Sequence, residues 1–413
     1  MFNSPKSNFK LIKEFNELKV LRLVKEEGPI SRIDISKKTK ISKPTISEIT
    51  YRLIENGFLQ EVGKGKSSFK GGKKPILLKL NFFAGAVIGI EIKRSFTNIA
   101  LANLDSQIIR KYKITYPIGS LTEFILDKIF NQIENILNLS EVNDTKKWGV
   151  AIGIPGLIDY NKGSLKVADT LQGWDDFSIR DIFENRLEFP TYVENDVKAL
   201  SIGERFYGSG KNVNNLVCLW IGEGIGAGIV IDGKLMRGIT GSAGEIGYNE
   251  LGYWLKSKRK FSLLFDNQRD FGEIISEPVL IKAAERAIQK GYESTLSKNN
   301  PITINSIGKA AESGDKLACS LLEEMGALIG IVCINLLNTV NPEMIILCGQ
   351  IIEKCPMLLK LVQQNVHKDI LHTPAEAVQI CASKLKDEAV LKGAIGMVLH
   401  DWFEMPVNRI YPF

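Results

Sequence analysis

Residues 30–56 contain two short helix-forming segments separated by a tight turn, and they restrict the fold of the first part of the chain more than any other stretch. Ser31 and Ser42 are each placed to cap a helix, and Pro44 fits the first turn of the second helix because the amide hydrogens there have no intrahelical partner. The pattern indicates a helix-turn-helix, whose second helix lies in a DNA major groove, although ordinary helical hairpins share it. The apolar residues expected to face a small core are Ile33, Ile35, Ile41, Ile46, Ile49 and Leu53.

A loop rich in glycine and lysine, residues 63–75, separates two expected strands at residues 58–62 and 76–80. Together they predict a β-hairpin with a basic tip, which is the wing of a winged helix. Such a loop can approach DNA phosphates or the minor groove, whereas a basic run is usually only a solvated face. The residues predicted to contact DNA are Ser42, Lys43, Thr45, Ser47, Arg52, Lys64, Lys66, Lys73 and Lys74.

The positive charge of the chain is concentrated in its first 80 residues. These carry 18 Lys and Arg against 8 Asp and Glu, whereas residues 81–413 carry 35 against 39. A head that alone is strongly basic is expected if only this part of the chain contacts nucleic acid.

Composition disfavours several other classes of protein. The first ten residues are polar, so no secretory signal is expected, and no apolar run reaches the roughly 18 residues that span a bilayer. The six cysteines form no C-x-x-C pair and most lie in apolar runs, which indicates buried, reduced thiols. The three histidines all lie near the C-terminus, so a zinc site has few candidate ligands. We therefore predict a cytoplasmic protein that does not bind membranes.

From residue 84 onward, strand-rich segments alternate with helical ones. Strands are expected at residues 84–92, 96–104 and 108–116, a helix follows at 121–139, and a buried strand then enters the glycine–proline turn of WGVAIGIPGLID. Another strand-rich segment follows, which predicts two related α/β lobes with ligands at strand ends. The expected domains are a DNA-binding head at residues 1–80, a first lobe at 81–195 and a second lobe at 196–413, whose last helix can pack back on the first lobe.

The motifs of the chain resemble those of the ROK family, which comprises repressors and sugar kinases. ISKPTIS and GGKKPILLKL match the repressor branch, typified by bacterial xylose repressors, and GIPGLID, END, GEGIGAGIVIDGKL, GSAGEIG and NPEMIILCG match the ROK domain in order. The resemblance covers essentially the whole chain. It implies a winged helix-turn-helix followed by an actin-like (ribonuclease H-like), two-lobed ATPase-type α/β domain, which forms a homodimer and holds a sugar in its cleft.

The resemblance also implies which residues bind the sugar. Asp196 occupies the position at which the kinases of the family remove a proton from a sugar hydroxyl, although an aspartate there can also simply accept hydrogen bonds or cap a helix. Tyr248 stands where the family has a histidine that binds sugar or zinc, and the cysteine-rich loop beyond it is missing, so we predict no structural zinc. Trp174 is a candidate wall for the sugar ring and equally a candidate core residue. The expected sugar-binding residues are Gly156, Asn195, Asp196, Glu245, Tyr248 and Glu273.

The ATP-binding positions depart from the family pattern. Long cationic residues replace two glycines at a turn that must let the backbone approach phosphates, and Glu223 in the second glycine turn would repel them. Since phosphoryl transfer depends on positioned phosphate contacts, we predict no kinase activity and no ATP binding. The degenerate ATP site consists of Glu91, Lys93, Arg94, Gly222, Gly224 and Gly349.

We therefore predict a transcriptional repressor of carbohydrate-utilisation genes, in which a monosaccharide changes how a dimer binds operator DNA. Xylose is the first candidate, and glucose, N-acetylglucosamine and an oligosaccharide fragment are the others. Two alternatives stay open: an ATP-dependent sugar kinase with a DNA-binding head, and a DNA-binding protein that no sugar affects.

Overall fold

The computed structural model describes residues 5–65, 74–168, 171, 173–249, 263–264, 270–298, 301–369 and 378–403. The chain divides into two compact units, each of which contains segments that lie far apart in the sequence. The domain boundaries predicted at residues 80 and 195 stay predictions. The first unit comprises Met1–Ile154, Lys162–Val193 and Ala394–Phe413, and the second comprises Pro155–Asn161 and Glu194–Gly393.

The head begins the first unit. Ser31 caps α2 by accepting the Asp34 amide, and Ser42 caps α3 by accepting the Thr45 amide, so both predicted helix starts are confirmed. β2 and β3 pair antiparallel and form the predicted hairpin. The described elements of the head are α1 (Pro5–Glu27), β1 (Ile30–Ser31), α2 (Arg32–Thr39), α3 (Lys43–Glu55), β2 (Leu59–Lys64) and β3 (Ile76–Leu80), with the sheet order β1-β3-β2.

Four of the six apolar residues expected in the core of the head are buried, Ile41 is half-buried and Ile33 is exposed. Ile35, Ile46 and Leu53 are fully buried, but Ile33, which was expected in the core, is 47% exposed. Ile33 and Ile35 are two residues apart on α2, and residues at that spacing leave a helix in different directions. Only one of the two can therefore face the core.

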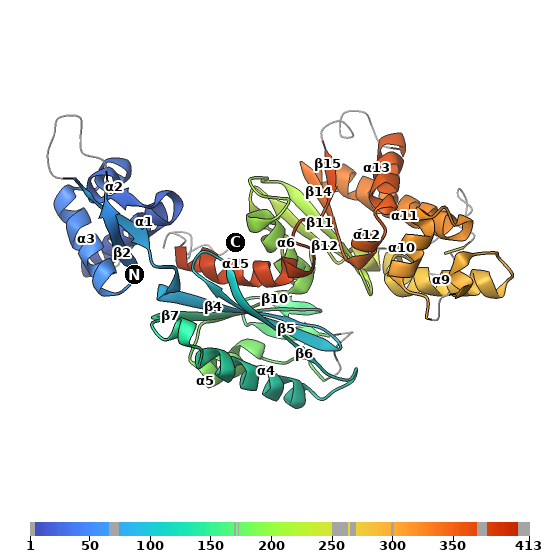
Figure 1. Ribbon diagram of the computed structural model, residues 1–413, viewed down its shortest axis with the longest axis horizontal. Coiled ribbons are helices and arrows are strands. Elements are labelled where there is room, and N and C mark those ends of the chain that lie inside the picture. The colour runs from blue at the N-terminus through green and yellow to red at the C-terminus, as the bar shows by residue number, and fades with distance from the viewer. Residues whose placement is uncertain are drawn as a thin grey trace. The chain divides into compact units, whose positions relative to one another are not determined.

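After the head in the sequence, the first unit contains a sheet in the order β10-β7-β4-β5-β6, in which β4 is antiparallel to β5 and parallel to β7. Figure 1 shows α4 and α5 on one face of this sheet, and the rings of Phe130 and Phe183 pack there with centroids 4.8 Å apart. Trp402 of α15 packs on Gly149 of β7. The elements of this part are η1 (Phe82–Ala84), β4 (Gly85–Ile92), β5 (Phe96–Asn103), β6 (Ile108–Thr115), α4 (Thr122–Leu137), η2 (Ser140–Val142), β7 (Lys147–Ile154), β9 (Ser164–Val167), α5 (Ile179–Leu187) and β10 (Thr191–Asn195).

The sheet of the second unit has the order β13-β12-β11-β14-β15, with β11 antiparallel to β12 and parallel to β14. This order matches that of the first sheet read from β6 to β10, so that β11 corresponds to β4. Val217 and Leu219 of β11 join the core formed by α9, α10, α11 and α13, whereas Leu216 and Cys218 join a smaller core with α6. Its elements are β8 (Leu157–Asp159), α6 (Asp196–Tyr207), β11 (Leu216–Ile221), β12 (Ile225–Ile231), β13 (Lys234–Leu235), η3 (Ile246–Tyr248), α8 (Phe271–Ile274), α9 (Glu277–Gln289), η4 (Thr295–Lys298), α10 (Ile304–Glu312), α11 (Lys316–Val340), β14 (Met344–Cys348), α12 (Gln350–Lys354), α13 (Met357–Asp369), β15 (Gln379–Ala382), η5 (Lys386–Glu388) and α15 (Ala389–Phe403), which continues into the first unit.

The shared strand order confirms the expected pair of related α/β lobes, since in each sheet two successive antiparallel pairs are followed by a parallel pair. By length and composition alone, the 25-residue helix α11 could cross a membrane. Its apolar residues, such as Leu321 and Ile329, are buried in the core of the second unit, and a core helix passes the same test. All six cysteines are free thiols, four buried and two half-buried.

Candidate functional site

The turn between β10 and α6 carries three successive polar residues that are all buried. Glu194, Asn195 and Asp196 are 2%, 8% and 6% exposed. The Asn195 side-chain oxygen accepts the backbone amides of Val197 and Lys198 at 3.0 and 3.1 Å and thereby caps α6. Asp196 is the first residue of α6, where the helix dipole favours a carboxylate, and it accepts the Val197 amide at 2.9 Å.

Gly156 lies beside this turn. Its carbonyl accepts the Asn195 side-chain amide at 3.1 Å, and its φ of +118° is a conformation that favours glycine. The structure thus brings Gly156 and Asn195 together, but it uses both polar atoms of the Asn195 side chain to build the turn. Asn195 is therefore a structural residue of this turn.

Two ion pairs connect the turn to the loop that follows β13. Arg237 Nε donates to Glu194 Oε2 at 2.7 Å, and its guanidinium lies 3.8 Å from the centre of the Tyr160 ring. Lys198 Nζ lies 3.7 Å from Glu245 Oε1. The side chains of Glu194, Lys198 and Arg237 are 2%, 3% and 13% exposed, whereas that of Glu245 is 38% exposed. The more open side of this cluster is therefore the Glu245 carboxylate.

The remaining two predicted sugar-binding residues lie on neighbouring elements of the same unit. η3 carries Tyr248 and α8 carries Glu273, and a side chain at Gly272 would lie 3.4 Å from the Gly247 carbonyl oxygen. Both Tyr248 and Glu273 are exposed. The structure therefore brings η3 and α8 together and leaves both side chains at the surface.

The segment expected to replace a zinc loop is described only in part. Around this segment, Leu264 and Phe271 are buried, and Phe261, the third apolar residue that could hold it by packing, lies outside the described residues. Within the described ranges, no group of three His, Cys, Asp or Glu side chains could hold a metal ion.

Trp174 lies in the first unit and is 1% exposed. Its ring packs against that of Phe177 with centroids 5.5 Å apart. It is therefore a core residue of that unit.

The β4–β5 hairpin contains the first degenerate phosphate turn. Glu91 is buried, accepts the Asn98 side-chain amide at 2.8 Å and lies 3.6 Å from Lys93 Nζ. The Lys93 backbone amide donates to the Phe96 carbonyl at 2.9 Å, and Arg94 is exposed. The Lys93 amide and the Glu91 and Lys93 side chains are thus engaged within the hairpin, whereas a phosphate site needs amides directed at the ligand.

The β11–β12 hairpin contains the second such turn. The Gly222 amide donates to the Gly224 carbonyl at 2.9 Å, and the Gly222 carbonyl accepts the Glu277 amide at 2.8 Å. Burial raises the pKa of Glu277 above its usual value, a hydrogen bond from the Ile351 backbone opposes this, and nearby Glu223 raises the pKa further. Two carboxylates stand close enough here to interact, so the turn disfavours another anion.

Gly349 has a structural explanation of its own. It follows β14 with φ of +111°, and a Cβ atom there would lie 1.9 Å from the Ile221 carbonyl oxygen. The strand packing alone therefore requires glycine at this position.

In the head, α3 presents most of the predicted base-contacting residues on its outer side. Ser42, Lys43 and Ser47 are exposed, and Thr45 is half-buried, with its hydroxyl 2.8 Å from that of Ser42. The opposite side of the helix is buried at Ile46, Ile49 and Leu53. The helix thus has one side in the core and one polar side available to a partner.

Arg52 differs from the other predicted DNA contacts. Its guanidinium pairs with Glu48 at 2.7 Å and with Glu17 of α1 at 3.0 Å, and it is 25% exposed. These contacts connect α3 to α1. Of the wing lysines, Lys64 and Lys74 are exposed, whereas Lys66 and Lys73 lie outside the described residues.

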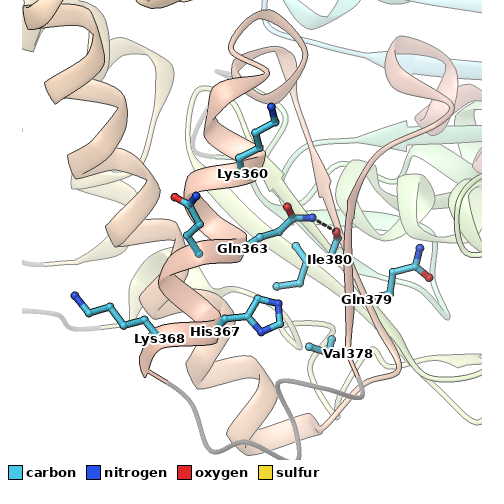
Figure 2. A pocket seen from close by; sticks show the side chains of 8 residues that line it. Lys360, Gln363, His367, Lys368, Val378, Gln379 and Ile380 are labelled. Atoms are coloured by element: carbon cyan, nitrogen blue, oxygen red, sulfur yellow. Dashed lines mark hydrogen bonds between the residues drawn. The ribbon is translucent and has the colours of Figure 1, made fainter.

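A separate hollow of about 900 Å³ lies between α13 and β15, and Figure 2 shows Gln363 donating to the Ile380 carbonyl at 2.9 Å inside it. The described residues that line it include none of the predicted sugar-binding residues. They are Lys360, Gln363, Gln364, His367, Lys368, Val378, Gln379 and Ile380.

Sequence reasoning missed Glu194, Lys198 and Arg237. Charged residues are mostly exposed, so a lone lysine or arginine in the sequence gives no reason to expect burial. The two members of one of these pairs also lie 43 residues apart, where no local pattern connects them. Only the position of Glu194 and Lys198 beside Asn195 and Asp196 offered a signal.

Comparisons with known proteins agree with this arrangement. The sequence model of the ROK family matches residues 87–401, and that of the MarR family matches residues 15–61. The chain is 31% identical to a protein named xylose repressor from Caldicellulosiruptor bescii, over 97% of this chain and 99% of the relative.

Two solved structures are also similar. One, described as a ROK family transcriptional regulator and homologue of the E. coli MLC protein, has a TM-score of 0.79 and 25% identity, covering 95% of this chain and 98% of that one. A ROK family glucokinase from Streptomyces griseus has a TM-score of 0.63 and 24% identity, covering 76% of this chain and 99% of that one, and it shares the fold alone.

Proposed function

Because the chain belongs to the ROK family, we propose that it is a sugar-responsive transcriptional repressor of carbohydrate-utilisation genes. The observation that carries this proposal is the joining of a helix-turn-helix head to a ROK domain in one chain that matches a xylose repressor over 97% of its length. Since a repressor works where the DNA is, we assign it to the cytoplasm.

We assign DNA binding to the exposed side of α3 and to the wing. Lys43 and Ser47 are exposed at the N-terminal end of the helix, which is the part that contacts base edges in helix-turn-helix proteins. Lys64 and Lys74, together with Lys66 and Lys73, then contact phosphates or the minor groove. Two heads of a homodimer would bind half-sites about one helical turn, roughly 34 Å, apart.

We assign sugar binding to Asp196, Glu245, Tyr248 and Glu273 of the second unit. Carboxylates accept hydrogen bonds from hydroxyl groups, and a tyrosine can both donate and accept them. Asp196 is held by the first turn of α6, and Glu245 by Lys198, which supports preformed acceptors at both positions. D-Xylose is the first candidate ligand.

We also propose that the protein binds no ATP and needs no zinc, and that it does not phosphorylate its sugar. The engaged Lys93 amide in one turn and the carboxylates of Glu223 and Glu277 at the other support this. Asp196 would then act as a hydrogen-bond acceptor, because no phosphoryl group is available to transfer.

The sugar controls repression only if it binds the two DNA-binding states with different affinity. The first experiment is thermal melting of the full chain with D-xylose, D-glucose or N-acetyl-D-glucosamine, each with and without ATP and Mg²⁺. A ligand present at 100 times its Kd stabilises the folded state by about 2.7 kcal/mol. We expect one sugar, and not ATP, to raise the melting temperature.

The same protein then selects duplexes from a random-sequence DNA pool, and the bound duplexes are titrated with that sugar. Repressor function predicts palindromic duplexes whose binding constant changes with the sugar. A stabilising effect of ATP, followed by release of ADP with the sugar, would favour the kinase. Selected duplexes whose binding no sugar alters would favour a constitutive DNA-binding protein.

A further inference from the structure

The loop after β13 is held at both ends by charged residues that flank Asp196 in the sequence. At its start, Arg237 pairs with Glu194, two residues before Asp196, and at its end, Glu245 pairs with Lys198, two residues after it. Three of these four side chains are at least 87% buried, so the Arg237–Glu194 pair is interior and the Lys198–Glu245 pair has one buried partner. They fix where Glu245 lies relative to Asp196.

Lys198 is an unusual residue for its position. It lies in the first turn of α6, where the helix dipole disfavours a cation, and its side chain is only 3% exposed. A buried ammonium is costly unless it is paired, and within the described part of the chain its ion partner is Glu245. Replacing this lysine by an apolar residue would remove that cost, so its presence calls for a role beyond packing.

The helix geometry limits what that role can be. Asp196 and Lys198 are two residues apart, so their side chains leave α6 in different directions. Lys198 therefore acts on the candidate sugar site through its contact with Glu245, and its side chain does not lie beside that of Asp196. At 3.7 Å, its ammonium is an ion-pair partner for one carboxylate oxygen, and the 38% exposure of Glu245 leaves that carboxylate accessible to a ligand.

We propose that Lys198 is the positioning residue of Glu245, holding its carboxylate in the orientation that accepts one particular hydroxyl hydrogen of a neutral sugar. This inference rests on the proposed sugar site and deepens it. The acids Glu194, Asp196 and Glu245 exceed the cations Lys198 and Arg237 by one charge. The site therefore favours an uncharged polyhydroxylated ligand over a sugar acid or a sugar phosphate.

The test uses the full chain and isothermal titration with whichever of D-xylose, D-glucose and N-acetyl-D-glucosamine binds most tightly. The variants are Lys198→Met, Glu245→Gln and the two combined, with Lys198→Arg as the conservative replacement. Lys282→Met, at an exposed lysine of α9, is the matched control. Each protein is also titrated with the monodeoxy derivatives of that sugar, and the wild type with D-glucuronate beside D-glucose.

Loss of a hydrogen bond to a charged group corresponds to roughly a tenfold to hundredfold weaker Kd, so this loss is expected for Lys198→Met and for Glu245→Gln. The double variant should bind no more weakly than Glu245→Gln alone, because both changes remove the same contact. The deoxy sugar that lacks the hydroxyl accepted by Glu245 should bind the wild type weakly. Its Kd should not weaken further in either single variant. Lys198→Arg should restore part of the affinity.

A purely structural role predicts a different pattern, namely equal losses for every deoxy sugar and additive effects in the double variant, and that result would overturn the proposal. Tighter binding of D-glucuronate than of D-glucose would overturn the assignment of a neutral ligand. If Lys198→Met does not fold, Lys198→Gln takes its place in the cycle. Absence of binding by the wild type to all three sugars would instead reject the sugar site itself.

Discussion

The head and the β10–α6 region both depend on charged side chains, but they place them in opposite surroundings. In the head, Lys43, Lys64 and Lys74 are exposed, and the ion pair between Arg22 and Glu26 has both side chains more than half exposed. Around the β10–α6 turn, charged side chains are buried and paired with one another. The two regions therefore use charge for different purposes.

The difference follows from what each region binds in the proposed function. DNA presents a regular array of phosphates, which exposed lysines reach by long-range attraction and without a fixed geometry of their own. A sugar presents neutral hydroxyls, which are distinguished only by acceptors held in fixed positions. Exposed charges are screened by salt, whereas buried ones are screened much less, so the two regions should respond differently to salt and to mutation.

The largest expected effect is that of Asp196→Ala. Removal of this carboxylate should abolish the response of DNA binding to sugar, while the affinity for DNA without sugar stays unchanged because the head is untouched. Fluorescence anisotropy of a selected duplex, with and without sugar, measures both. Asp387→Ala, at an exposed acid of the same unit, serves as the control. Release of DNA at the normal sugar concentration would show that the sugar site lies elsewhere.

The second effect compares one buried and one exposed ion pair. Arg237→Met leaves the Glu194 carboxylate buried and unpaired, which typically costs about 3–5 kcal/mol of folding free energy. Arg22→Met breaks an exposed pair, which typically costs about 0–1 kcal/mol. Urea unfolding of both variants beside wild type measures the difference. Similar losses in the two variants would remove the distinction between the regions.

The third effect concerns salt. Lys43→Ala and Lys74→Ala should each reduce the slope of log K against log salt concentration by about one, if each lysine neutralises one phosphate. Lys37→Ala, at an exposed lysine of α2 outside the predicted contacts, should leave the slope unchanged. Sugar binding by all three variants should show little dependence on salt. An unchanged slope in Lys43→Ala would exclude this lysine from phosphate contact.

The smallest effect tests the second degenerate phosphate turn. Because the folded protein raises the pKa of Glu277, ionising this carboxyl costs folding free energy, and the cost develops as pH rises from the unfolded value through the folded one. Glu277→Gln should therefore raise the melting temperature at pH 7 and have no stabilising effect near pH 4. Asp387→Ala, measured at both pH values, is the control. Equal stabilisation at pH 4 would point to packing and not to charge.

Local sequence signals predicted much of the secondary structure. The caps at Ser31 and Ser42 and the strands β4, β5 and β6 depend on neighbouring residues, and the structure places them where the sequence indicated. Ile33 was incorrectly predicted to be buried, because periodicity alone does not show which of two nearby apolar residues faces the core. The role of Trp174 could not be decided because a tryptophan suits a core and a ligand wall equally well.

The sequence by itself determined the family, the basic head and the succession of strands and helices from residue 84, because these depend on composition, periodicity and motifs within short stretches. Tertiary structure alone decided that Asn195 builds its turn, that Arg52 joins α3 to α1 and that Lys198 and Arg237 are buried beside acids. The physical reason is that burial and ion pairing depend on residues brought together from distant parts of the chain. A local sequence pattern does not show which residues from distant parts of the chain come into contact.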